Sequence, residues 1–322
     1  MRVGFDTSPL AQTGAGTARH VRGLMGALAG RSGLELVVVS AGGAGKLASL
    51  RRDALWYPLR LGAVSRRLDL LHCTTFRAPL RPRCPLVVTV HDLAVMHHPE
   101  AFPYWHRTTG AAALRASARV ADVVVAVSET VAGETEELLG IPRERIVVVP
   151  NGVDPVFRPD GPREEGGYVL AVGTLEPRKN LVRIAEAAVL AGKSLRVAGA
   201  EGWGRVQVPG WVGRPSDGAL AALYRGADCL VFASLHEGFG IPVLEAMACG
   251  TPVVTSRGGA LEEVAGGAAV LVDPFDPVSI AAGIRDASAR RDALSALGRA
   301  RAAAFTWEAA ADRVEALWRR LA

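Results

Sequence analysis

Short runs of β-branched residues alternate with longer alanine-rich stretches along almost the whole chain, and this alternation constrains the fold more than any other feature. In the first half, the runs fall near 2–6, 35–40, 69–72, 86–90, 122–127 and 146–149. Each run is nearly all apolar, which is typical of strands buried on both faces of a parallel sheet. Helices that connect these strands are expected near 17–29, 105–119 and 129–139.

The second half repeats the alternation, with strands expected near 168–172, 195–198, 207–208, 229–233, 252–255 and 270–272. Helices are expected near 180–191, 216–226, 242–249, 259–265 and 277–287, followed by an amphipathic stretch from Trp307 to Leu321. Residues 150–167 are rich in Pro, Gly and Asp and are typical of a linker. We therefore expect an α/β protein with two doubly wound, Rossmann-like domains in series. Ligands of such sheets bind beyond the carboxyl ends of the strands.

The composition fits a soluble globular protein of two domains, because the 322 residues are 49% hydrophobic and 21% charged. No run approaches the roughly 20 apolar residues of a membrane span, and the opening MRVGFDTSPL is typical of a strand rather than a signal peptide. Four cysteines have no metal-like spacing and are expected to be thiols in a reducing compartment: Cys73, Cys84, Cys229 and Cys249.

The net charge of +5 lies entirely in the first half, where residues 1–160 hold 19 basic and 14 acidic residues. Residues 46–83 alone hold nine basic residues against two acidic ones. Two interpretations stay open for this stretch: contact with an anionic membrane or acceptor, or a solvated arginine-rich face. Nucleic acid is not expected, because the stretch has few aromatic residues and they form no platform interleaved with the charges.

The segment HEGFGIPVLEAMACGTPVV, residues 236–254, follows an expected strand and opens an expected helix. Pro242 suits the first helical position and Gly250 the position just past the helix end. Glycines allow close approach of the backbone, and the amides of a helix start suit a phosphate. Glu237 lies in the loop and Glu245 in the expected opening turn of the helix, where it is either a favourable charge or a ligand group.

The segment VGTLEPRKN, residues 172–180, places two adjacent cations at another turn from strand to helix. Arg178 offers a planar fork and Lys179 a point charge, so the pair can bridge oxygens of a diphosphate. The alternative is that both are exposed basic residues at the start of a helix. In the first half, the apolar strand VVTV leads directly into His91, which can donate to a sugar hydroxyl, take a proton, or be structural.

Together these segments resemble the retaining glycosyltransferases of family 4, which have the GT-B fold. The resemblance runs nearly end to end through TGAGTARHVRGLMGAL, VVTVHDL, RIVVVPNGVDPVFRP, VGTLEPRKNL and HEGFGIPVLEAMACGTPVVTS. The wording of the motifs is closest to mannosyltransferases. The resemblance implies an N-terminal acceptor-side domain (1–155), a nucleotide-sugar-binding domain (156–305) that faces it across a cleft, and a C-terminal helix (306–322) that crosses back to the first domain.

The resemblance also implies roles for individual residues. Four residues would take part in catalysis: Glu237, beside the transferred sugar; His91, on the donor sugar; and Lys179 and Arg178, on the diphosphate. Glu245 would accept hydrogen bonds from the ribose, and the backbone at Trp211 and Val212 would hold the base. The remaining donor-binding positions are Gly14, Gly16, Gly173, Thr174, Gly238, Phe239, Gly240 and Ile241.

The reaction implied is transfer of a hexosyl unit from a nucleotide-diphosphate sugar, GDP-mannose or a UDP-hexose, to a hydroxyl of a glycan or lipid-linked acceptor, with retention of configuration. No DxD-type motif follows a strand, so neither a metal nor a cofactor is expected, and the place of action would be the cytoplasm or the inner membrane face. Two departures from the family concern Thr174, where an arginine is common, and the short region 41–70. The alternatives are a nucleotide-sugar epimerase and a non-catalytic nucleotide-sugar-binding subunit.

Overall fold

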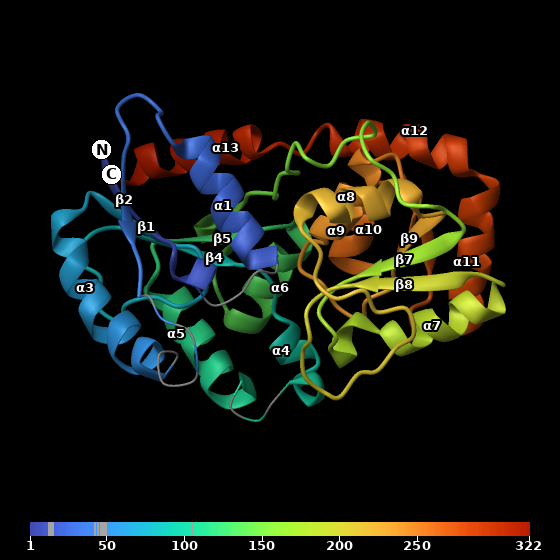
Figure 1. Cartoon of the computed structure of the whole chain (residues 1–322). Helices are drawn as coiled ribbons and strands as arrows, with labels where there is room; N and C mark the ends of the chain where they lie inside the picture. Colours follow the sequence, from blue (N-terminus) through green and yellow to red (C-terminus); the bar gives the residue numbers. More distant parts are fainter. Residues whose placement is uncertain (12–15, 42, 44, 46–49, 103, 105) are drawn as a thin grey trace. The chain divides into compact units, whose positions relative to one another are not determined.

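The computed structural model describes the chain except residues 12–15, 42, 44, 46–49, 103 and 105, and it divides into two compact units (Figure 1). Unit 1 comprises residues 1–152 and 307–322, and unit 2 comprises residues 153–306. The chain thus enters unit 2 inside the linker-like segment 150–167 and returns to unit 1 at Trp307.

Unit 1 is built on a six-stranded parallel sheet in the order β2-β1-β3-β4-β5-β6. The strands are β1 (Arg2–Asp6), β2 (Glu35–Val39), β3 (Leu70–Cys73), β4 (Leu86–Val90), β5 (Val123–Ala126) and β6 (Ile146–Val148). Each corresponds to an apolar run of the sequence. The central strands β3, β4 and β5 are buried along their whole length, as continuous apolar runs require.

Helices of unit 1 are α1 (Gly16–Leu28), α3 (Leu61–Val64), α4 (Ala94–His97), α5 (Ala111–Val120), α6 (Glu129–Leu139) and α13 (Trp307–Leu321). Single 3₁₀ turns lie at Ser8–Ala11, Ser65–Arg67, Pro99–Ala101 and Arg143–Arg145. Helices α1 and α13 pack on each other and on the sheet (Figure 1), where Leu24, Trp307 and Trp318 are part of one buried cluster.

Two helical stretches of unit 1 differ from the expectation. The helix expected at 105–119 is wound as a π-helix over His106–Gly110 and becomes the α-helix α5 only from Ala111. A further helical stretch, which the sequence analysis did not predict, runs through the π-helix Arg52–Arg60 into α3. Pro58 and Gly62 lie inside this stretch, and both residue types disfavour helix in a sequence-based reading.

Unit 2 is built on a five-stranded parallel sheet in the order β11-β10-β9-β7-β8. The strands are β7 (Tyr168–Val172), β8 (Ser194–Ala198), β9 (Cys229–Phe232), β10 (Val253–Ser256) and β11 (Val270–Val272). The strand expected at 207–208 is absent from the described residues, which was a wrong prediction. The chain pairs with the edge strand β8 three residues later instead, through a single bridge between Val197 and Trp211.

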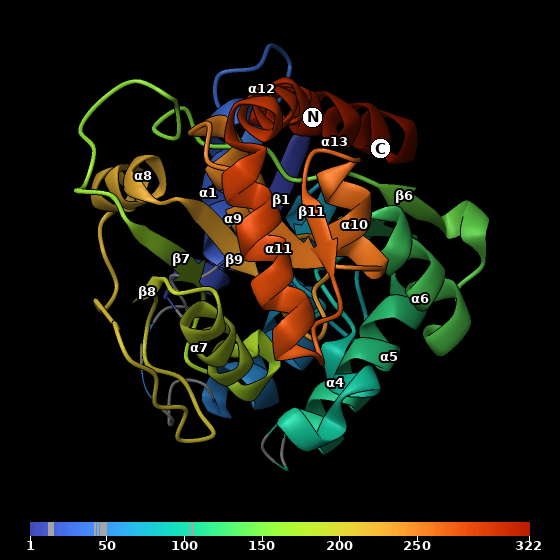
Figure 2. The same cartoon turned by 90° about the vertical axis from the view of Figure 1, so that its right-hand side faces the viewer.

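Helices of unit 2 are α7 (Leu181–Leu190), α8 (Asp217–Gly226), α9 (Ile241–Ala248), α10 (Gly259–Ala265), α11 (Pro277–Ala289) and α12 (Arg291–Ala302), with a 3₁₀ turn at Pro177–Lys179. Figure 2 shows α7 and α11 side by side, and their apolar side chains share one core with the strands. Helix α12 was not predicted, because it follows α11 directly and its arginine-rich sequence lacks an obvious start.

Two further findings concern the whole described chain. All four cysteines are unbridged, and Cys73, Cys229 and Cys249 are buried, as expected. Among the described residues, no helix has the length and apolar character that crossing a membrane requires.

Candidate active site

The loop after β7 is held in place by Asn180, which lies between the 3₁₀ turn Pro177–Lys179 and helix α7. Asn180 adopts the left-handed conformation (φ 59°), which asparagine tolerates better than most residues. Its side-chain amide donates to the carbonyl oxygens of Ala233 (2.9 Å) and Pro274 (2.6 Å). The turn that carries Arg178 and Lys179 is thereby tied to the chain segments that follow β9 and β11.

The loop after β9 lies directly against this turn. The backbone N–H of Leu235 donates to the Arg178 carbonyl (2.9 Å), and the Arg178 guanidinium donates to the carbonyl of His236 (2.6 Å). The segments 172–180 and 236–254, which the sequence analysis singled out separately, therefore meet at the carboxyl edge of the unit 2 sheet. This is the edge at which doubly wound sheets bind ligands.

The two cations of this site are paired with two carboxylates. Arg178 contacts Glu176 at 2.7 Å and Glu237 at 3.0 Å, and the Lys179 ammonium group donates to the other oxygen of Glu237. The four side chains are only 4–14% exposed. Arg178 and Lys179 are therefore not solvated residues at a helix start, and that alternative from the sequence analysis is wrong.

The two carboxyl groups respond differently to this environment. Burial would raise the pKa of Glu237, but Arg178 and Lys179 together lower it to about 2. Burial raises the pKa of Glu176, and the nearby cations offset only part of the effect. Glu237 is thus an ionised group at neutral pH, which can accept hydrogen bonds but cannot act as a general acid.

Gly173 and Thr174 lie beside Lys179. A Cβ atom at Gly173 would come within 3.2 Å of the Lys179 Cδ, so the glycine makes room for the lysine stem. The Lys179 ammonium also lies 5.2 Å from the centre of the Phe232 ring, a cation–π distance. Thr174 is partly exposed, and its carbonyl accepts from the Glu176 N–H (2.8 Å).

Helix α9 begins at Ile241, and Gly240 before it has a φ of 97°, which favours glycine. The second helical residue, Pro242, has no N–H, and the N–H of Val243 donates to the Gly240 carbonyl (2.9 Å). Gly238 and Phe239 are buried, and the Phe239 ring packs against Phe305 at 6.0 Å. Gly250 has a φ of 75° just past the helix end, as predicted.

Glu245 differs from the expectation. It lies beyond the first turn of α9, so the prediction that it belongs to the opening turn was wrong. Its carboxylate is 1% exposed and accepts a hydrogen bond from the hydroxyl of the buried Tyr224 (2.9 Å). The effect of the helix dipole is confined to the first turn, so it does not account for the position of Glu245.

Trp211 and Val212 lie along the outer edge of β8. The Val212 N–H donates to the Val197 carbonyl (2.9 Å), and the Trp211 indole donates to the Gly199 carbonyl (2.9 Å). Because peptide groups alternate along an extended strand, the backbone N–H and C=O of Trp211 itself face away from β8. The two side chains are 43% and 48% exposed.

In unit 1, His91 follows β4 and is partly exposed. Its Nε2 lies 2.8 Å from the Thr74 carbonyl oxygen, which can only accept, so Nε2 carries the proton and donates. Burial lowers the pKa of His91. The neutral ring therefore presents Nδ1 as an acceptor. Gly16 is the first residue of α1, whereas Gly14 lies outside the described residues.

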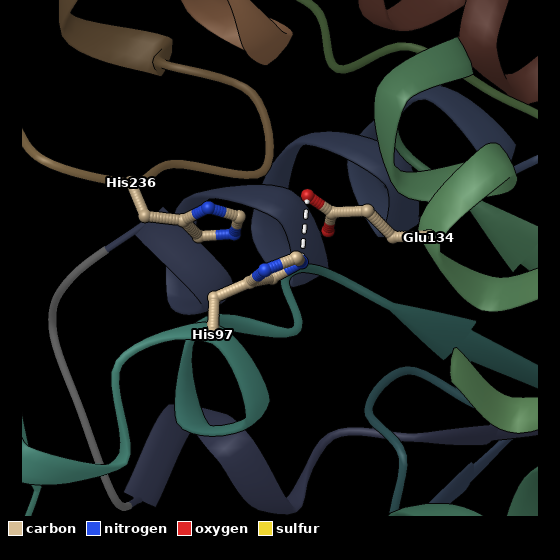
Figure 3. Close-up of side chains that lie close together, drawn as sticks. All are labelled: His97, Glu134 and His236. Carbon is tan, nitrogen blue, oxygen red and sulfur yellow. Dashed lines mark ion pairs between the residues drawn. The ribbon is translucent and has the colours of Figure 1, made fainter. Parts of the chain in front are cut away.

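In unit 1, His97 of α4 also pairs with Glu134 of α6. Their side chains point toward each other, and His97 Nε2 lies 3.2 Å from Glu134 Oε1 (Figure 3). Burial and the charges of Asp92 and Glu137 raise the pKa of Glu134 to about 7. Neither residue was predicted to have a role, because a contact across 37 positions leaves no local signal in the sequence.

Other functional candidates were also missed in the sequence. Glu176 and Asn180 were noticed only as part of a motif, although they fix the geometry of Arg178 and the turn. An available signal was the proline between Glu176 and Arg178, which restricts the turn and favours contact between their side chains. Thr74 acts on His91 through its backbone, for which no residue-type signal exists.

Two sequence-family models match the chain. Residues 14–157 match the model described as Glycosyltransferase Family 4, and residues 167–289 match the model described as Glycosyl transferases group 1. The first match lies in unit 1 except for its last five residues, and the second lies within unit 2.

Curated relatives share about a third of their aligned residues with the chain. The chain is 32% identical over 254 residues to the O-antigen chain mannosyltransferase B of Escherichia coli. The alignment covers 69% of this chain and 67% of the relative. The chain is also 32% identical over 311 residues to a D-inositol 3-phosphate glycosyltransferase of Geodermatophilus obscurus, which covers 84% of this chain and 69% of the relative.

Solved structures with the same fold include a sucrose-phosphate synthase from Thermosynechococcus elongatus, with a TM-score of 0.81 at 20% identity, covering 100% of this chain and 99% of that one. The Anabaena protein HepE, solved in complex with UDP-glucose, has a TM-score of 0.75 at 19% identity and is covered completely, as is this chain.

Proposed function

Since the chain belongs to glycosyltransferase family 4, we propose that it transfers a hexosyl unit from a nucleotide-diphosphate sugar to an acceptor hydroxyl, with retention of configuration and without a metal ion. The enzyme class, glycosyltransferase, and the GT-B fold are those expected from the sequence. The observation that carries the proposal is the meeting of Arg178, Lys179 and Glu237 at the carboxyl edge of the unit 2 sheet.

Arg178 and Lys179 are proposed to bind the donor diphosphate and to stabilise the charge that grows on it as the glycosidic bond breaks. In support, both cations are fixed before any donor arrives, Arg178 by the Glu176 and His236 contacts and Lys179 by Glu237. Such fixed charges need no reorganisation during the reaction. An anion at the start of α9 would be met by the backbone amides of 239–241, ahead of Pro242.

Glu237 is proposed to hold hydroxyls of the transferred sugar. Its low pKa keeps it ionised, which suits an acceptor of hydrogen bonds. Glu237 would keep its contacts to Arg178 and Lys179, and its remaining lone pairs would accept hydrogen bonds from the sugar hydroxyls. A general-acid role, as in glycoside hydrolases, is disfavoured by the same pKa. The acceptor hydroxyl would then attack from the side of the departing diphosphate, through a short-lived oxocarbenium-like species.

His91 is proposed to accept a hydrogen bond from a donor-sugar hydroxyl through Nδ1, since Nε2 donates to Thr74. Gly14 and Gly16 are proposed to let the N-terminal loop approach the diphosphate. The backbone N–H and C=O of Trp211, which face away from β8, suit hydrogen bonds to a base, and Val212 beside it is anchored to Val197. Glu245 is proposed to receive the ribose hydroxyls, which requires a change in its buried surroundings.

The donor is proposed to be GDP-mannose, with a UDP-hexose as the alternative. The name of the E. coli mannosyltransferase favours mannose, whereas the UDP-glucose bound to HepE favours a UDP-sugar. The acceptor is proposed to be a glycan or a lipid-linked sugar, consistent with the O-antigen chain named for the same relative. The proposed place of action is the cytoplasmic side, at the inner membrane face.

A thermal-shift panel of nucleotide-diphosphate sugars tests the donor, because a binder raises the midpoint with the logarithm of its concentration. The expected result is a shift with GDP-mannose or one UDP-hexose that Lys179→Ala abolishes. Product analysis with the donor so found and a mixture of glycan acceptors should give an α-linked product in the presence of EDTA. A product formed from the donor alone would indicate an epimerase, and binding without any turnover would indicate a non-catalytic subunit.

A further inference from the structure

The helical stretch 50–67 exposes large apolar side chains to water. Leu50 is 66% exposed, Leu55 46%, Leu59 62% and Val64 36%. They recur every four or five residues, so they lie on the outer side of a helix whose π-wound part has more than four residues per turn. The inner side of the same helix is buried, and the Tyr57 hydroxyl donates there to Asp6 (3.0 Å).

Arginines accompany these apolar residues. The loop that follows β3 lies against α3, because the Arg83 N–H donates to Ser65 Oγ (2.9 Å) and the Arg81 carbonyl oxygen would lie 2.7 Å from a Cβ atom at Gly62. We define the arginine–leucine face as the exposed side chains of both segments: Leu50, Arg51, Leu55, Leu59, Arg60, Val64, Arg66, Arg67, Leu80, Arg81 and Arg83.

The charge of this face is positive because it carries six arginines and no acidic residue. The two nearest acidic residues in the sequence have other partners. Asp53 pairs with Arg77 (2.9 Å), and Asp69 accepts from the backbone N–H of Arg2 (2.7 Å). Exposed apolar residues occur elsewhere without this charge. On α7, Val182 and Val189 are 60% and 76% exposed, but that helix carries one arginine and one glutamate.

We propose that the arginine–leucine face binds the surface of a lipid bilayer with anionic headgroups. The leucines and Val64 would enter the boundary between headgroups and acyl chains, and the guanidinium groups would bind lipid phosphates. This combination favours a bilayer over a soluble polyanion, because a polyanion has no apolar region in which the exposed leucines could be buried. The inference is independent of sugar transfer, since it concerns neither the donor site nor its residues.

A vesicle flotation assay tests the proposal without any nucleotide sugar. The wild-type chain should float with vesicles of phosphatidylcholine and phosphatidylglycerol, far less with phosphatidylcholine alone, and less at high salt. The double variant Leu55→Glu/Leu59→Glu should lower the partition coefficient at least about tenfold. The matched control Val182→Glu/Val189→Glu adds the same charges on α7 and should bind like the wild type.

Three results would overturn the proposal: no flotation of the wild-type chain, equal losses in the control variant, or full binding by Leu55→Glu/Leu59→Glu. The last result would mean adsorption by charge alone. Circular dichroism melting checks that each variant folds. If the leucine variant does not fold, Arg60→Glu/Arg66→Glu/Arg67→Glu serves in its place, because these side chains are exposed, and it should lose binding to the same extent.

Discussion

Glu237 of unit 2 and Glu134 of unit 1 are buried to a similar degree, with side chains 10% and 15% exposed, but their acidities differ greatly. Burial acts on both in the same direction, toward a higher pKa. Two cations bring the pKa of Glu237 down to about 2, whereas two acidic neighbours help to raise that of Glu134 to about 7. The His97 imidazole near Glu134 is charged only when protonated.

Burial alone therefore does not identify a functional carboxylate. The charges around a buried carboxylate are more informative, because they show which kind of ligand the site can bind. Around Glu237, two cations stand against one other carboxylate, that of Glu176, and two adjacent cations suit a diphosphate. Around Glu134 the surroundings are acidic, which disfavours any phosphate.

The largest effect is expected on sugar transfer. Glu237→Gln and Lys179→Ala should each lower kcat at least about 100-fold, because each removes a charge aimed at the reacting centre. Glu134→Gln should stay within a few-fold of the wild type. Lys193→Ala is the matched control. Lys193 also pairs with a carboxylate, that of Asp228, but this pair lies where β8 and β9 begin, at the opposite edge of the sheet from Lys179. Initial rates with a labelled donor are measured for all four variants. Normal turnover by Lys179→Ala would show that the cations around Glu237 have no part in sugar transfer.

A second effect is expected on stability when Arg178 is removed. Arg178→Ala leaves Glu176 buried without its ion-pair partner, which should cost about 3 kcal/mol of unfolding free energy near neutral pH. Because the pKa of Glu176 is already raised, protonation at lower pH should relieve part of this cost. Urea unfolding at several pH values measures it, and a loss that does not depend on pH would contradict the assignment of that cost to Glu176.

The smallest effect is expected on the pH dependence of stability, where the two glutamates should act with opposite sign. The folded-state pKa of Glu237 is lowered, so its stabilisation is present above the unfolded value and is lost as pH falls toward 2. The pKa of Glu134 is raised, so a cost develops as pH rises toward 7. Relative to the wild type, Glu134→Gln should therefore gain up to about 2 kcal/mol between about pH 5 and 8.

Glu237→Gln should instead be most destabilised near neutral pH and should approach the wild type as the solution becomes acidic. Unfolding free energies of both variants across pH decide the matter. Parallel curves for the two variants would show that the surroundings of Glu237 and Glu134 do not differ as described.

Much of the fold follows from the sequence, because parallel strands buried on both faces leave continuous apolar runs. The runs at Leu86–Val90 and Val253–Ser256 are examples, and both strands lie in the interior of their sheets. The expected strand at 207–208 failed because its alternating valines do not pair, and the chain reaches β8 only at Trp211. The helix Arg52–Arg60 was missed because Pro58 argues locally against it, whereas burial of Tyr57 decides in its favour.

The candidate site was predictable in its residue types but not in its pairing. The motif around Arg178 and Lys179 indicates an anion site, yet both cations pair with Glu237, which is 58 positions away from Lys179. The depth of Glu245 and the contact between His97 and Glu134 also arise from tertiary packing. No local pattern encodes such contacts.

The central claim is that Arg178 and Lys179 recognise a diphosphate. Calorimetric titration of UDP and GDP, each beside its monophosphate, into the wild-type chain and Lys179→Ala tests it directly. For one of the two bases, the diphosphate should bind the wild type at least about tenfold more tightly than the monophosphate, and Lys179→Ala should remove most of that difference. Equal affinities for the monophosphate and the diphosphate, or an unchanged preference in Lys179→Ala, would contradict the claim.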